Sequence, residues 1–309
     1  MVQKIKENIE KVMVGQSETI DLLLTAILSE GHILIEDMPG TGKTVLCSSL
    51  ARSISGKFNR IQFTPDLLPS DVTGLNYYNQ KEGEFVFKKG PAFCNILLAD
   101  EINRATPRTQ SSLLECMAEK QITVDGITSP LNKPFLIIAT QNPLETLGTY
   151  PLPEAQLDRF LMRINMKAPT KDTEVAILKR FMTDEPLKSL DNVCTAVQIN
   201  ELVAKCKEVH VHDLIVDYIA DIAVESRESA VFEVGISPRG SLALLSAVRA
   251  YAFIQGRDFV IPEDVKAIAV PVLAHRVQIT GGFSSPIEQR NAIENLLNTV
   301  SITTEEWSK

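Results

Sequence analysis

The chain of 309 residues is 44% hydrophobic and 23% charged, which excludes a disordered protein and leaves room for two compact domains. Its formal net charge of −8 gives no general attraction to nucleic acid or to an anionic membrane surface. The sequence has no apolar run of the roughly 18 residues that a membrane span needs, and its first residues lack the apolar stretch of a signal peptide. The five cysteines are scattered and odd in number, so we expect reduced thiols in a cytoplasmic protein.

The first two thirds of the chain alternate between short apolar runs and helical patterns. The apolar runs predict buried strands at residues 32–35, 60–63, 96–99, 135–139 and 161–164. Helices are expected between them, at about 19–29, 43–54, 107–119 and 154–158. This alternation predicts an α/β fold with a parallel sheet covered by helices on both faces.

Two segments interrupt this rhythm. Residues 122–128 alternate around Asp125-Gly126, a pair that favours a two-residue hairpin turn. Residues 75–87, which include Tyr77 and Tyr78, have the pattern of an exposed hairpin or loop insertion.

The pattern changes after residue 168, where strand-like runs give way to helix-start signals. These signals are Thr170, Ser237-Pro238, Pro262 and Ser285-Pro286, and a Ser or Thr cap followed by proline is a favourable helix start. We therefore expect a nucleotide-binding core over residues 1–168, a linker over 169–184 and a smaller all-helical lid domain over 185–309.

The most specific motif is a P-loop, Pro39-Gly40-Thr41-Gly42-Lys43-Thr44, which follows a predicted strand and opens a helix at Val45. The glycines let the backbone approach phosphate oxygens, and the helix N-terminus favours an anion. Lys43 suits the β- and γ-phosphates of ATP, and the Thr44 hydroxyl suits Mg²⁺. The first glycine of the usual pattern is replaced by Asp37, whose carboxylate must turn away from the phosphates.

Two further strands end in polar side chains. The strand at 96–99 is followed by Asp100, which can hold Mg²⁺, and by Glu101, which can act as the general base on the attacking water. Because side chains alternate along a strand, this pair shares one face only if the strand ends there. Asn142 follows the strand at 135–139, and the carboxyl ends of parallel strands meet at one edge of the sheet. Asn142 is therefore a candidate for holding the water or the γ-phosphate.

Two arginines complete the constellation. Arg159 ends a short helix, and Arg239 lies in the first turn of another, where a cation opposes the helix dipole unless an anion compensates. A γ-phosphate is one such anion. A surface salt bridge is the alternative for either arginine.

The order of these motifs resembles that of an AAA+ ATPase, with Walker A, Walker B, sensor 1, arginine finger and sensor 2 in sequence. Within that superfamily the residues of the motifs resemble those of the MoxR family. The segments that carry the resemblance are residues 98–105, 139–143, 148–160 and 236–239. The resemblance covers nearly the whole chain.

The resemblance implies a five-stranded parallel sheet of order 5-1-4-3-2, a helix-2 insert at about 64–90 and a hairpin before sensor 1 at about 119–134. It implies a ring, usually a hexamer, in which Arg159 acts on a neighbour's nucleotide, with Arg104 as a weaker candidate for inter-subunit contact. Val14, Gly15 and Gln16 would line the adenine. Similar proteins are chaperone-like, often act beside von Willebrand factor A domain proteins, and assist metal-cofactor insertion or complex assembly.

Two alternatives to a client-remodelling ATPase remain at this level. A nucleic-acid motor is disfavoured by the acidic balance and by a hairpin region whose main basic residues are Lys120 and Lys133. A non-catalytic nucleotide switch is disfavoured because all the expected catalytic residue types are present.

Overall fold

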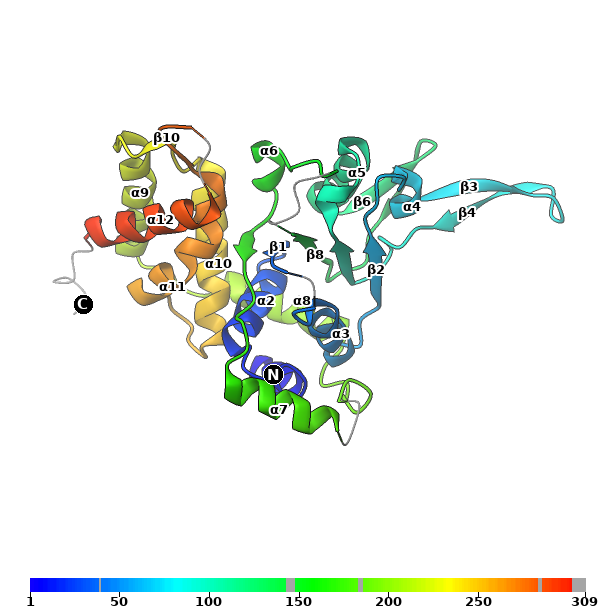
Figure 1. Ribbon diagram of the computed structural model, residues 1–309, viewed down its shortest axis with the longest axis horizontal. Coiled ribbons are helices and arrows are strands. Elements are labelled where there is room, and N and C mark those ends of the chain that lie inside the picture. The colour runs from blue at the N-terminus through cyan, green and yellow to red at the C-terminus, as the bar shows by residue number, and fades with distance from the viewer. Residues whose placement is uncertain (39, 143–147, 183–185, 283–284, 302–309) are drawn as a thin grey trace.

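The computed structural model describes residues 1–38, 40–142, 148–182, 186–282 and 285–301. Figure 1 shows two parts, a core in which helices flank a central sheet and a lid of helices formed by the C-terminal part of the chain. Pro39 of the predicted P-loop lies outside the described residues. Within the described ranges, every helix is too short or too polar to cross a bilayer.

Five parallel strands form the central sheet, in the spatial order β2-β5-β8-β1-β9. When only these five are counted along the chain and the sheet is read from the β9 edge, the order is 5-1-4-3-2, as the resemblance implies. The strand labels and this count differ because the labels also number the hairpin strands, which lie between the sheet strands along the chain. The strands are β1 (Ile33–Glu36), β2 (Phe58–Gln62), β5 (Ile96–Asp100), β8 (Leu136–Gln141) and β9 (Met162–Ile164).

The side-chain alternation of the strands divides the core into two hydrophobic clusters, one on each face of the sheet. On β5, Ile96 and Leu98 belong to the first cluster and Leu97 and Ala99 to the second. Because both faces are covered, the strands are apolar along nearly their whole length. The first face is covered by α1 (Val2–Glu10), α2 (Ser17–Leu28) and α3 (Lys43–Ser53), the second by α4 (Pro69–Thr73), the 3-10 turn η1 (Ile102–Arg104) and α5 (Pro107–Glu119).

Two hairpins project from the core, one in each segment that interrupts the alternation. Asp125 and Gly126 both have positive φ, at 50° and 79°, as the twist of a two-residue hairpin requires. Asn76 Nδ2 donates to Asp125 Oδ2 at 2.7 Å and joins the two hairpins. In Figure 1 the ribbon of β3 and β4 extends well beyond the rest of the molecule. The strands are β3 (Gly74–Asn79), β4 (Glu84–Lys89), β6 (Gln121–Val124) and β7 (Ile127–Pro130).

Four of the described helices after residue 168 begin where the sequence signals predict. Thr170, Ser237 and Ser285 each cap a helix by accepting a hydrogen bond from the backbone N–H three residues ahead. The helices are α6 (Glu154–Leu157), α7 (Lys171–Phe181), α8 (Ala196–Lys207), α9 (Asp213–Glu228), α10 (Pro238–Ile254), α11 (Pro262–Leu273) and α12 (Pro286–Thr299), with the 3-10 turn η2 (Ala274–Arg276).

The lid is helical apart from a short antiparallel pair, β10 (Phe232–Val234) and β11 (Gln278–Ile279). The sequence did not predict this pair, because strands of two or three residues are too short to show an alternating pattern.

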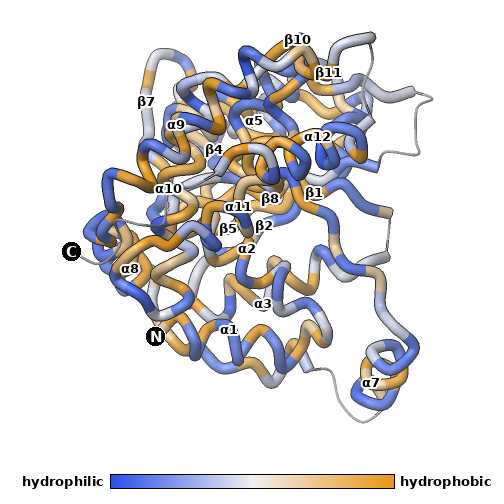
Figure 2. Tube along the Cα trace, turned by 90° about the vertical axis from the view of Figure 1, so that its left-hand side faces the viewer, coloured by the Kyte–Doolittle hydropathy of each residue, from blue (hydrophilic) through white to orange (hydrophobic). Residues whose placement is uncertain are grey.

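The core and the lid share the first hydrophobic cluster. Helices α8 and α10 of the lid pack against α2 of the core, and their apolar faces join one continuous set of buried residues. Figure 2 shows hydrophobic segments gathered at the strands and at α10 and α11, whereas α7 stands apart. The lid is therefore fixed to the core by apolar packing.

His32 links three elements of the core. Its Nδ1 accepts from the N–H of Ile137 at 3.0 Å, and its Nε2 donates to the carbonyl of Met117 at 3.2 Å. The ring is buried just before β1 and so joins β8 to the end of α5. Burial lowers the pKa of His32 to about 4.

We expect the free energy of unfolding to fall as the pH is lowered from 6.5 toward 4. The unfolded chain takes up a proton on this histidine near pH 6.5, whereas the folded chain does not until about pH 4. The free energy of unfolding that His32 contributes should fall by about 2 kcal/mol at pH 5. Burial also lowers the pKa of His275, which acts in the same direction. Urea unfolding at pH 7.5 and 5.0 measures the effect. In His32→Gln the free energy of unfolding should depend less on pH than in the control His210→Gln, which changes an exposed histidine. If His32→Gln showed the same pH dependence as wild type, the prediction would be contradicted.

Candidate nucleotide-binding site

The loop between β1 and α3 has the geometry of a phosphate cradle. Gly40 and Gly42 have φ of 87° and 90°, values that strain any residue with a side chain. A Cβ at Gly40 would meet nothing within 4 Å, so this side of the loop is open. Gly42 is the N-cap of α3, and no side chain of the described residues caps that helix. Its first backbone N–H groups are therefore available to an anion.

Lys43 and Asp37 both fold onto this loop. Lys43 Nζ donates to the carbonyl of Met38 at 2.6 Å and to that of Asp37 at 3.3 Å. Asp37 Oδ1 accepts from the N–H of Met38 at 2.7 Å. One carboxylate oxygen of the residue that replaces the first P-loop glycine is thus bound to the backbone N–H of the next residue, although Asp37 still lines the cavity.

The two carboxylates come together because the strand ends between them. Asp100 is the last residue of β5, and Glu101 takes the left-handed conformation with φ 55° and ψ 51°. A non-glycine residue in that region is uncommon and is often found at functional sites. The turn breaks the strand alternation and brings Glu101 to the same cavity as Asp100.

Thr140, near the end of β8, holds both acidic residues. Its Oγ1 donates to Asp100 Oδ1 at 2.6 Å and accepts from the backbone N–H of Glu101 at 2.9 Å. The side chain is buried, with 2% of its surface exposed. The sequence indicates no role for Thr140, which lies in the 139–143 segment, because a threonine beside an apolar run is ordinary at the end of a strand.

Each carboxylate also has a cationic or amide partner that the sequence missed. Arg60 Nη2 lies 2.7 Å from Asp100 Oδ2, and Gln62 Nε2 donates to Glu101 Oε2 at 2.6 Å. Arg104, a candidate for inter-subunit contact, lies with its Nε 3.0 Å from Glu101 Oε2 of its own chain. Arg60 and Gln62 lie on the edge strand β2, and their alternate spacing was the only available signal of a shared face.

These residues surround one cavity of about 540 Å³ at the carboxyl edge of the sheet. It brings together the P-loop, both carboxylates and buried Asn142. Thr41 lies within the same loop. The residues that line the cavity are Asp37, Gly40, Gly42, Lys43, Thr44, Val45, Arg60, Gln62, Thr64, Asp100, Glu101, Arg104, Thr140, Gln141 and Asn142.

The segment predicted to line the adenine, Val14 to Gln16, contributes none of the described residues that line this cavity. A Cβ at Gly42 would lie 3.5 Å from Cε of neighbouring Met13. Gln16 Nε2 donates to the carbonyl of Lys167 at 2.7 Å, and Gly15 has φ 75°. The adenine role remains a prediction.

The two arginines lie apart from this cavity. Neither Arg159 nor Arg239 is among the described residues that line it. Arg159 Nη1 donates to the carbonyl of Leu114 on α5 at 2.9 Å. Arg239 Nη1 lies 3.1 Å from the carboxylate of Asp158, the residue just before Arg159.

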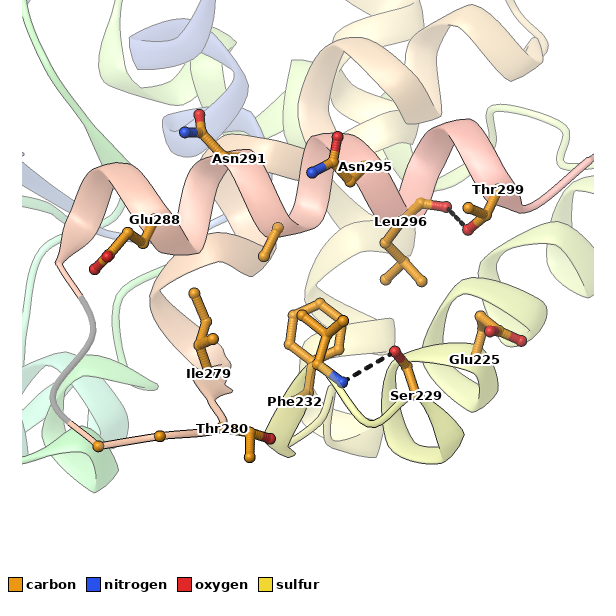
Figure 3. Close-up of a pocket in the computed structure, with 14 residues that line it drawn as sticks. Glu225, Ser229, Phe232, Ile279, Thr280, Glu288, Asn291, Asn295, Leu296 and Thr299 are labelled. Carbon is orange, nitrogen blue, oxygen red and sulfur yellow. Dashed lines mark hydrogen bonds between the residues drawn. The ribbon is translucent and has the colours of Figure 1, made fainter.

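A second cavity, of about 480 Å³, lies in the lid (Figure 3). Phe232, Ile279 and Leu296 form its apolar wall, and the amides of Asn291 and Asn295 stand on α12 above them. The described residues that line it include two glutamates and neither lysine nor arginine, so it does not suit a polyphosphate. Among the described residues we also find no group of three or more potential metal ligands from His, Cys, Asp and Glu.

We expect Thr140→Val to lower ATP turnover about 10-fold and to raise the Mg²⁺ concentration needed for half-maximal rate, since partners that orient metal ligands are typically worth 10–100-fold. The change keeps the shape of the side chain and removes the bonds to Asp100 and Glu101. Phosphate release over a Mg²⁺ titration measures it. Thr123→Val, exposed on β6, is the matched control, and an unaltered Mg²⁺ dependence at position 140 would overturn this role.

The comparisons with known proteins agree with this geometry. Residues 32–162 match the ATPase family associated with various cellular activities (AAA), and residues 224–297 match the AAA lid domain. The chain is 47% identical to YeaC of Bacillus subtilis over 90% of this chain and 87% of that protein. It is 39% identical to Chaperone MoxR1 of Mycobacterium tuberculosis over 95% of this chain and 80% of that one. A crystal structure from Cytophaga hutchinsonii, described as a candidate ATPase, superposes with a TM-score of 0.90 at 39% identity, covering 98% of this chain and 94% of that chain. The chain therefore belongs to the MoxR family of AAA+ ATPases.

Proposed function

We propose that this protein is a ring-forming, chaperone-like ATPase that couples ATP hydrolysis to the remodelling or maturation of client proteins. The observation that carries the proposal is the single cavity lined by Lys43 and Thr44 of the P-loop and by Asp100 and Glu101 of the neighbouring strand end. A glycine-lined anion cradle opposite two carboxylates is the arrangement that phosphoryl transfer from a nucleotide to water requires.

In this proposal each polar group exchanges its present partner for the substrate. Lys43 leaves the loop carbonyls for the β- and γ-phosphate oxygens of ATP, whose charge attracts it more strongly. Thr44 and Asp100 would hold Mg²⁺, which when bound neutralises charge on the phosphates. Asn142 orients the attacking water or the γ-phosphate.

Glu101 is the proposed general base. It takes a proton from the attacking water while the water oxygen bonds to the terminal phosphorus and the bond from phosphorus to the bridging oxygen breaks, giving ADP and phosphate. To do so it must release Gln62 and Arg104, which hold its carboxylate in this structure.

The position of Arg159 and Arg239 supports a ring. Among the described residues neither lines the cavity of its own chain, and Arg239 pairs with Asp158, the residue just before Arg159, so we assign both to the nucleotide of a neighbouring subunit. A head-to-tail contact that supplies an arginine to the next site gives a ring when the rotation between subunits closes, and we propose a closed hexamer.

The chaperone role draws on the name of the relative Chaperone MoxR1. A partner with a von Willebrand factor A domain and a client that takes up a metal cofactor are the finer parts of this proposal. The five scattered cysteines favour a reducing compartment such as the cytoplasm.

For Glu101→Gln, we expect nucleotide binding to persist while turnover falls at least about 100-fold, because a general base contributes 10²–10⁴-fold. Binding of a fluorescent ATP analogue and phosphate release separate the two effects. Glu201→Gln, on the exposed surface of α8, should leave both unchanged. Near-normal turnover in Glu101→Gln would defeat the assignment of the base.

For Arg159→Ala, we expect unchanged nucleotide affinity with hydrolysis reduced about 10³-fold or more, the scale of an arginine finger. The reason is that the side chain is not among the described residues that line its own site, and in this proposal it acts only across an interface. The rate should be compared with wild type at a protein concentration where light scattering detects rings. A rate that stays near wild type rules out a trans finger at this position.

A further inference from the structure

The chain segment that carries Arg159 is held by the lid. Arg276, in η2, donates from Nη1 to the carbonyl of Asp158 at 3.0 Å and from Nη2 to the carbonyl of Phe160 at 2.7 Å. These two carbonyls come immediately before and after Arg159 in the sequence. One guanidinium group therefore fixes the backbone on both sides of the arginine.

Arg276 is buried and has a hydrogen-bond or ion-pair partner for each of its three guanidinium nitrogens. Its side chain is 3% exposed, its Nε donates to the carbonyl of Val272 at 2.9 Å, and its charge is balanced by the carboxylate of Asp158. A buried guanidinium without such partners would be costly. The planar fork reaches several acceptors at once, which the single ammonium of a lysine cannot reproduce. Gly240 leaves room for it, because a Cβ there would lie 3.3 Å from Arg276 Cδ.

Arg276 is also linked to the second arginine outside the nucleotide cavity. Asp158 offers Oδ1 to Arg276 and Oδ2 to Arg239, which lies 3.1 Å away. The same lid residue thus contacts the backbone of both neighbours of Arg159 and shares a carboxylate with Arg239.

The segment keeps other attachments that do not involve Arg276. His275 Nε2 donates to the carbonyl of Phe160 at 3.1 Å, and Gln278 donates to Glu154. Phe160 is fully buried in the second hydrophobic cluster. Loss of Arg276 therefore leaves the segment attached to the fold but frees the peptide groups around Arg159.

We infer that Arg276 is a positioning residue for hydrolysis at the neighbouring subunit's nucleotide, because it holds the backbone on both sides of Arg159 and shares the carboxylate of Asp158 with Arg239. This inference rests on the proposed trans action of Arg159. It makes the lid of one subunit a determinant of turnover in the next.

The first test measures turnover and nucleotide affinity separately. We expect Arg276→Met and Arg276→Lys to lower kcat about 10- to 100-fold, since a misplacement of about 1 Å can cost 10²-fold. The affinity for a fluorescent ATP analogue should stay within about twofold of wild type, because the nucleotide cavity lies elsewhere. The lysine variant keeps the charge next to Asp158, so an equal loss in both variants assigns the effect to the geometry of the fork.

Arg227→Met is the matched control. Arg227 is a lid arginine whose Nε donates to the carbonyl of Ala223, four residues back, as Arg276 does to Val272. None of its hydrogen bonds in the described residues reaches the core. Its kcat should equal that of wild type. Thermal unfolding of all variants and light scattering with nucleotide confirm that each folds and assembles.

The second test mixes subunits and detects an effect that a general structural role would not produce. Arg276→Met keeps a competent P-loop, and Lys43→Ala keeps a competent arginine segment. In an equal random mixture about a quarter of the interfaces pair the two intact halves, since each head-to-tail interface joins one site to one arginine. We expect ATPase activity well above that of either variant alone. The reference mixture is Arg159→Ala with Lys43→Ala.

The outcomes separate the two proposals. Recovery in both mixtures supports both. Recovery only in the Arg159 mixture shows that Arg276 acts within its own subunit and overturns its positioning role, while the trans finger stands. If neither mixture recovers, Arg159 does not act across an interface and both proposals fall. An unchanged kcat in Arg276→Met and Arg276→Lys also overturns the positioning role.

Discussion

The geometry of the site depends on one constraint, the parallel arrangement of strands β1, β5 and β8. Parallel strands deliver their carboxyl ends to the same edge of the sheet, so the P-loop after β1 lies opposite the acidic end of β5. Thr140 on β8 then joins the two acidic residues through one hydroxyl. Helices on both faces bury the strands and hold their ends in register.

The charged groups at this edge already have protein partners. Lys43 is bound to loop carbonyls, Asp100 to Arg60, and Glu101 to Gln62 and Arg104. In the proposed mechanism a nucleotide therefore exchanges one set of polar contacts for another.

The lid matters because it is continuous with the core in two ways. Apolar packing of α8 and α10 on α2 fixes its position, and polar side chains from η2 and α12 reach the ends of core strands. Arg163 on β9 is one such link, since its Nη2 donates to Gln289 of α12 at 2.6 Å and its Nε lies 3.7 Å from buried Glu36, which precedes the P-loop. A shift of the lid would therefore change contacts of both strand β1, which precedes the P-loop, and residues 158–160, which include Arg159.

The sequence by itself determined the five strands of the central sheet, both hairpins and the residue types of the P-loop. Apolar runs fix which segments become buried strands, capping residues such as Ser237 and Ser285 fix where helices begin, and the motif residues follow directly from their order along the chain. The acidic pair was predicted to share a face only if the strand ended, and the left-handed turn at Glu101 meets that condition.

Only the tertiary structure decided which polar side chains meet. Gln62 and Thr140 lie far from the acidic pair in the sequence, and nothing in their local pattern distinguishes them from other strand residues. From the sequence alone, Arg239 could bind a γ-phosphate or form a surface salt bridge. In the folded chain it pairs with Asp158. Arg276 follows an unremarkable helix and gains its importance from a contact 116 residues away along the chain. Such pairings are set by chain topology and by long-range packing, which local composition does not encode.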